Sequence, residues 1–184
     1  MKRLLVCTTL LVVAATLSAQ QTPPKAPPKS PPATESATIG GKTITISYNS
    51  PGVKGRAGKI FTKDGLISKD PTYPVWRAGA NAATKLHTEA DLSLDGLAVP
   101  KGDYSLYVDI SDPDHWMLIV NKQTGQWGTN YDKAQDLGRV EFHTTTLPEL
   151  VENLKYTIKD LGDNKGTLTL AWENKCATVH IKVQ

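Results

Sequence analysis

Alternation of apolar and polar residues, interrupted by short turn motifs, is the feature of this sequence that most constrains its fold. Ile44, Ile46 and Tyr48 are separated by Thr45 and Ser47, which is the period-two pattern of a half-buried β-strand. The pair Gly40-Gly41 stands just before this run and predicts a two-residue hairpin turn. Helical periodicity is nearly absent, so the pattern predicts an all-β fold.

The same pattern recurs along the chain with turn residues between the runs. The expected strands are residues 34–39, 42–48, 84–88, 91–94, 103–110, 115–120, 139–145, 153–159, 167–173 and 177–183. About nine or ten short strands at this spacing predict a single antiparallel β-sandwich of the jelly-roll kind. A short helical turn is expected over residues 147–151. Two long irregular segments, 49–71 and 121–137, are where a site is expected, because ordered loops often carry binding residues.

The N-terminus has the composition of a secretion signal. Lys2 and Arg3 precede a mostly apolar run, residues 4–17, that ends in small residues, which predicts a signal peptide over residues 1–19. A second cleavage point near Ala15 and an uncleaved anchor are the alternatives. The run is too short to predict a transmembrane helix. We expect an exported protein, periplasmic or extracellular, without a transmembrane span after cleavage.

Residues 20–34 form a proline-rich segment ahead of the expected β domain, residues 35–184. Proline fixes φ and lacks an N–H, so such a segment favours an extended, disordered tether over a helix or a sheet. The tether would hold the domain away from the envelope, present a ligand to another protein, or serve only as a leader.

Charge and cysteine content exclude some classes of function. From Glu35 onward the chain has 17 basic and 18 acidic residues, without a basic cluster, so nucleic acid is not an expected partner. Cys7 would leave with the signal peptide, and Cys176 then has no partner for an internal disulfide.

Residues 73–84 do not fit a simple strand, because they place Trp76, Arg77 and Asn81 within six positions. Arg and Asn are rarely buried unless they are paired. One interpretation is a ligand site in which the Trp stacks and the Arg forms bidentate hydrogen bonds. The other is a structural Arg that binds loop carbonyls or pairs with Glu173 or an Asp. The same two interpretations apply to Arg56.

Two further aromatic residues, Trp127 and Tyr131, lie in the second irregular segment. Such loops form aromatic platforms for sugars or cations, although Trp127 could equally close the open end of a sandwich. Trp172 shares the inward parity of Leu168 and Leu170, which predicts core packing.

Four segments taken together, residues 50–56, 73–84, 126–132 and 168–173, resemble the bacterial family of exported proteins known as the domain of unknown function DUF2911. Residues 100–106 and the pair Asn121-Lys122 match its pattern as well, and the resemblance extends over residues 39–183. It implies a secreted β-rich domain and supplies no activity. The chain departs from the family pattern at Ala82, where an acidic residue usually follows the Asn. A site that needs that carboxylate would be incomplete here.

No motif for a cofactor, a metal ion or a nucleophilic centre is recognisable. His87, His115, His143 and His180 lie in different segments and lack the spacing of metal ligands. There is no nucleophile elbow, P-loop or dinucleotide fingerprint. We therefore expect neither a cofactor nor a metal site.

The leading hypothesis is a non-catalytic module that binds a small molecule, a glycan or an envelope protein. Its candidate ligand-binding residues are Arg56, Trp76, Arg77, Asn81, Trp127, Tyr131 and Glu173. The alternative is a carbohydrate-active hydrolase in which Glu173 and a loop aspartate form the carboxylate pair. A purely structural partner-binding protein is the third hypothesis.

Overall fold

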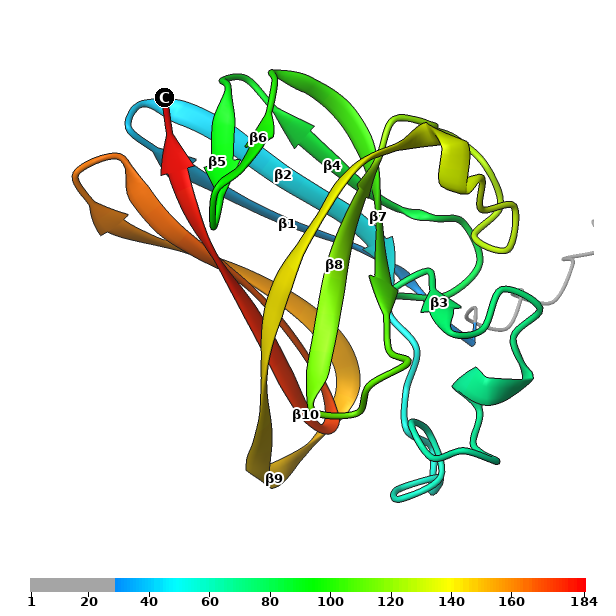
Figure 1. Cartoon of the computed structure of the whole chain (residues 1–184). Coiled ribbons are helices and arrows are strands. Elements are labelled where there is room, and N and C mark those ends of the chain that lie inside the picture. The colour runs from blue at the N-terminus through cyan, green and yellow to red at the C-terminus, as the bar shows by residue number, and fades with distance from the viewer. Residues whose placement is uncertain (1–28) are drawn as a thin grey trace, which may run out of the picture.

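The computed structural model describes residues 29–184, which form one antiparallel sheet of ten strands (Figure 1). The predicted signal peptide, residues 1–19, and the proline-rich segment as far as residue 28 lie outside the described residues. The first strand begins at Pro32, two residues before the expected boundary.

The first eight strands are short, and the last two are long. In chain order they are β1 (Pro32–Ile39), β2 (Lys42–Asn49), β3 (Val75–Trp76), β4 (Thr84–Thr88), β5 (Leu92–Leu94), β6 (Leu97–Val99), β7 (Gly102–Asp109), β8 (His115–Asn121), β9 (Asp136–Gly162) and β10 (Lys165–Val183). Two single 3-10 turns, η1 (Ile67–Lys69) and η2 (Lys133–Gln135), are the helical elements of residues 29–184. Over the same residues, no helix has the length and apolar character needed to cross a bilayer.

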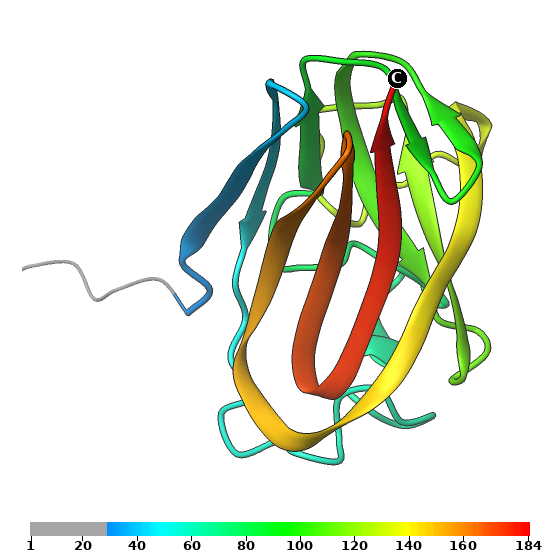
Figure 2. The same ribbon diagram turned by 90° about the vertical axis from the view of Figure 1, so that its left-hand side faces the viewer.

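The strand order is β1-β2-β4-β7-β8-β9-β10-β5-β6, and β3 pairs with β7. The sheet is open, but it curls until β1 contacts β9, so its two halves enclose one core in a sandwich-like arrangement (Figure 2). The predicted Gly40-Gly41 hairpin is confirmed: both residues have positive φ, 57° and 75°, as a type I′ turn requires. The predicted all-β antiparallel fold is therefore confirmed.

Two local predictions are wrong, and both concern the long strands. Residues 147–151, expected as a helical turn, lie within β9, and the residues expected to separate the strands 167–173 and 177–183 lie within β10. Figure 2 shows both strands bending sharply and running back. The pairing register shifts on both sides of Glu173, whose φ is 55°. Irregular pairing of this kind bends a strand without ending it, so residues with turn-like composition remain in the sheet.

Aromatic side chains fill the end of the core nearest to these bends. Trp76, Trp116 and Trp172 are fully buried, and Phe61 from the irregular segment packs against all three. The rings of Trp76 and Trp172 are stacked, with centroids 5.8 Å apart and an interplanar angle of 20°. The prediction that Trp172 belongs to the core is confirmed.

The outer edge of the second half of β9 has its backbone groups occupied by neighbouring segments. The Ile158 N–H donates to the Glu35 carboxylate at 3.1 Å, and the Tyr156 N–H donates to the Tyr48 hydroxyl at 3.3 Å. Nearer the bend, the Leu154 N–H donates to the carbonyl of Pro51 at 2.9 Å. These bonds attach β1, β2 and the following segment to the far end of the chain.

A basic cavity as the candidate functional site

A cavity of about 810 Å³ lies where the irregular segment 49–71 meets the segment that follows β3. Its volume falls within the range of small-molecule sites, about 300–1,000 Å³. Arg56, Trp76, Arg77 and Asn81 all contribute to its walls. The structure therefore brings together four of the seven candidate residues.

The walls of the cavity carry an excess of positive charge. Its one acidic residue is Asp70, against five basic residues: Lys29, Lys54, Arg56, Lys69 and Arg77. The domain from Glu35 onward is nearly neutral, so this concentration is local. Cations around a concave surface attract anions, because the low-dielectric walls strengthen their field.

Arg77 is held by a salt bridge to Asp70 and by the Asn81 carbonyl. Its Nη2 contacts the Asp70 carboxylate, its Nη1 lies 3.4 Å from the Asn81 oxygen, and both side chains of the pair are largely buried. The Thr72 hydroxyl donates to the other Asp70 oxygen at 2.9 Å. The structural pairing considered for Arg77 is thus present, with Asp70 as the partner, and the guanidinium still lines the cavity.

Arg56 is held by backbone carbonyls. Its Nε donates to the Val53 oxygen at 2.9 Å and its Nη2 to the Gly52 oxygen at 2.7 Å. Nη1 has no acceptor among residues 29–184, so the N–H donors on this edge of a positioned guanidinium remain available. Fixed donors of this kind suit a carboxylate or a phosphate.

The indoles of Trp76 and Trp172 contribute to the apolar part of the lining. Both are about 1% exposed, which is too little for the open stacking platform proposed for Trp76. The Nε1 atom of Trp172 is buried and has no hydrogen-bond partner within the described residues. A buried N–H without an acceptor is costly, so a ligand oxygen that reached it would be stabilised.

The loop that contains Trp127 lies directly behind Arg77. The Gly128 N–H donates to the Asn81 oxygen at 2.9 Å, and Ala82 forms an isolated bridge with Trp127. A Cβ atom on Gly128 would lie only 2.8 Å from Cβ of Arg77. The expected proximity of these two loops is present, although Trp127 itself is 54% exposed and does not line the cavity.

Tyr131 and Glu173 have other roles. Tyr131 packs on Tyr107, and its hydroxyl donates to Asp136 at 2.7 Å and accepts from Arg139 at 2.8 Å. Burial and the hydrogen bond to Asp136 raise the pKa of Tyr131 to about 12. Glu173 is buried and accepts from the Gly58 N–H, so it anchors the irregular segment to β10.

Sequence reasoning missed three lining residues that contribute strongly to the cavity: Lys54, Lys69 and Asp70. All three lie in segment 49–71, which was expected to border a site. Their convergence depends on how an irregular loop folds, which residue spacing does not predict. Trp172 was predicted as a core residue, and it is both a core and a lining residue.

The fold and cavity define a small antiparallel β protein. At one end of its core is a basic cavity whose lining includes the indoles of Trp76 and Trp172. The sequence profile of the family described as "Protein of unknown function (DUF2911)" matches residues 30–181. The chain belongs to this family. No curated protein and no solved structure matches the chain significantly.

Proposed function

We propose that the protein is a non-catalytic binding module whose cavity takes a small anionic ligand, such as a sugar that bears a carboxylate, sulfate or phosphate group. The observation that carries the proposal is the ratio of five basic residues to one acidic residue in a cavity of ligand size. Asp70 pairs with Arg77, and the excess of basic over acidic residues in the lining is the charge that a ligand would balance.

The distribution of the cations supports a bound anion better than a solvated basic surface. Arg56 is positioned by two carbonyls, and Arg77 is positioned by Asp70 and Asn81. Their guanidinium groups are therefore oriented before a ligand arrives, which reduces the entropic cost of binding. The lysines Lys54 and Lys69 are exposed and add attraction at longer range.

The hydrolase alternative receives less support from this site. Hydrolysis of a glycoside by the usual route needs two carboxylates about 5–10 Å apart. Asp70 is the one acidic residue that lines the cavity, and Glu173, the other candidate, is occupied by the Gly58 N–H. If the predicted signal peptide acts, the module would meet its ligand outside the cytoplasm.

Matched pairs of sugars test the proposal by isolating the charge. We expect at least one of galacturonate, glucuronate and glucose 6-phosphate to bind the full chain about tenfold or more tightly than galactose or glucose in isothermal titration calorimetry, a difference of about 1.4 kcal/mol. The affinity should fall as salt is raised, because exposed charges are screened.

Two double variants with the same change in net charge provide the control. Lys54→Gln with Lys69→Gln should weaken binding of the anionic sugar, whereas Lys101→Gln with Lys122→Gln, at exposed positions outside the cavity, should not. Equal affinity for neutral and anionic sugars, failure of every anionic sugar to bind, or equal losses in both double variants would contradict the proposal.

A further inference from the structure

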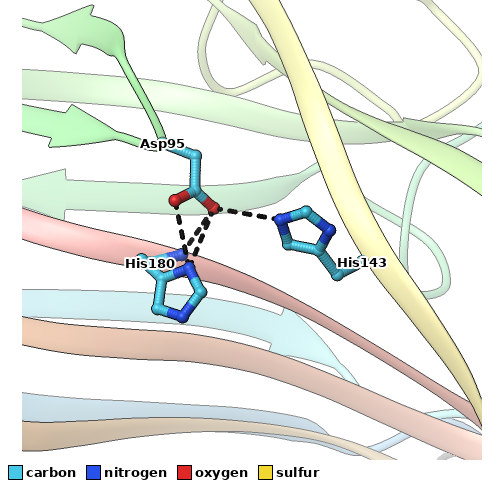
Figure 3. A group of neighbouring side chains, drawn as sticks. All are labelled: Asp95, His143 and His180. Atoms are coloured by element: carbon cyan, nitrogen blue, oxygen red, sulfur yellow. Dashed lines mark hydrogen bonds and ion pairs between the residues drawn. The ribbon is translucent and has the colours of Figure 1, made fainter.

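A separate cluster of side chains lies near the C-terminal end of β10, beyond the bend at Glu173. At this point the sheet divides. The pairing of β9 with β10 ends at His143 and Thr178, and from Ile181 onward the neighbour of β10 is β5. The β5–β6 hairpin occupies the fork between the two long strands (Figure 2). Its turn residue Asp95 lies at the point of the fork, between His143 of β9 and His180 of β10 (Figure 3).

These three side chains direct potential metal-ligand atoms toward one another. Nδ1 of His180 lies 3.0 Å from one Asp95 oxygen, and Nε2 of His143 lies 3.7 Å from the other. One ligand atom from each residue lies within 4.8 Å of the other two. Four-coordinate zinc with bonds of about 2.0–2.1 Å has ligand atoms about 3.3 Å apart, so small side-chain rotations would complete the geometry.

The far side of His143 carries a second carboxylate. Its Nδ1 lies 3.5 Å from Glu141, two residues earlier on the same face of β9. A carboxylate on the non-coordinating nitrogen is the usual support of a metal-binding histidine, because it fixes the tautomer and the ring orientation. The arrangement leaves Nε2 of His143 as the coordinating atom.

The backbone positions Asp95 independently of any ion. Asp95 has a φ of 42° in the two-residue turn of the β5–β6 hairpin, and its carboxylate accepts the His180 N–H at 2.9 Å. The aspartate is therefore fixed relative to β10, and the two rings remain half exposed, with 49% and 62% side-chain exposure for His143 and His180. An ion at this point would still have coordination positions open to solvent.

We propose that Asp95, His143 and His180 form a binding site for one divalent transition-metal ion of the zinc type, supported by Glu141. Two imidazoles and one carboxylate with open positions are a ligand set for such ions. Because the three ligands come from three strands or turns, the bound ion would join β5–β6, β9 and β10 at the fork. The inference is independent of the anion cavity, which lies elsewhere on the chain.

Titration of the full chain, freed of any affinity tag, with ZnCl2 tests the site. We expect one ion bound per chain, an increase in melting temperature on adding zinc, and changes in the ring signals of His143 and His180 in nuclear magnetic resonance spectra. His143→Gln and His180→Gln should each lower the affinity by more than about tenfold, because loss of a ligand should exceed the effect of losing a supporting residue.

His87→Gln is the matched control, since His87 is also a half-exposed histidine bound to one carboxylate, Asp103, at 2.8 Å. Among residues 29–184, His87 belongs to no group of three potential metal ligands, and its replacement should leave zinc binding unchanged. Both test histidines are on the outer face, so their variants should fold, which circular dichroism can verify. The site would be disproved by absence of zinc binding at millimolar concentration, or by equal losses in the His87 variant and the two ligand variants.

Discussion

At the scale of single residues, Gly128 determines how closely the two loops behind the cavity approach. Its backbone N–H donates to the backbone carbonyl oxygen of Asn81, and the same oxygen accepts a hydrogen bond from Nη1 of Arg77. The absence of a side chain at Gly128 allows Arg77 to pass directly over it. Arg77 is therefore positioned by the Asp70 carboxylate on one side and by the bare backbone of the Trp127 loop on the other.

Gly128→Ala should destabilise the protein by about 1–3 kcal/mol, the usual cost of inserting a methyl group into a filled space. The added Cβ would lie 2.8 Å from Cβ of Arg77 and 2.9 Å from the Asn81 oxygen. Urea denaturation measures the change. Thr129→Ala, which adds no atom near Arg77, is the control, and equal stability of Gly128→Ala and the parent would show that the loops are free to separate.

The raised pKa of Tyr131 predicts how the stability of the fold changes at high pH. Its pKa is raised from an unfolded value near 10 to about 12, so the folded state holds the proton more tightly. The stability linked to this group is present below pH 10 and is lost as the pH rises toward 12. Tyr131→Phe should therefore show a smaller loss of stability between pH 10 and 12, measured by urea denaturation at each pH. An unchanged slope would show that the Tyr131 hydroxyl does not titrate with the fold.

At the scale of elements, one buried side chain anchors the irregular segment 49–71. Glu173, at the bend of β10, accepts from the Gly58 N–H. Ile60 and Ile67 of the same segment are buried in the core. The segment that supplies most of the cavity's lysines is thus fixed at several points along its length.

Glu173→Ala should lower the free energy of unfolding by about 1–3 kcal/mol, because it removes the acceptor of the Gly58 N–H. Hydrogen exchange should become faster at the Gly58 amide. Glu173→Gln keeps an acceptor oxygen and should retain most of the protection. If exchange at Gly58 is the same in all three proteins, Glu173 does not hold the segment.

Most of the strands could be predicted from sequence, because burial on one face imposes a period of two. The end of β10 illustrates this: Val179, Ile181 and Val183 are buried, whereas His180 and Lys182 between them are exposed. The bends of β9 and β10 could not be predicted, since turn-like residues such as Asn174 and Lys175 also occur where a strand bends. The candidate sites were recovered only in part. Arg56, Arg77 and Asn81 were unusual enough in their local sequence to be noticed, whereas Asp95, His143 and His180 meet only because the sheet divides between them.

At the scale of the whole molecule, both halves of the sheet share one core, so the described domain should unfold as a unit. We expect the unfolding transitions followed by tryptophan fluorescence and by far-ultraviolet circular dichroism to coincide. Fluorescence will report on the core because Trp76, Trp116 and Trp172 are buried within it. Trp127→Phe should leave that transition in place, since Trp127 is exposed. Two separated transitions would show that the halves of the sheet are independent.

The side chains that occupy the outer edge of β9 have a consequence for behaviour in concentrated solution. A strand with unsatisfied N–H groups is a template for joining a second molecule edge to edge. Glu35 and Tyr48 occupy two of those groups on β9, and a carboxylate at such an edge also repels an incoming strand that carries negative charge. The first strands of the domain therefore cover part of the edge at which a second molecule would pair with β9.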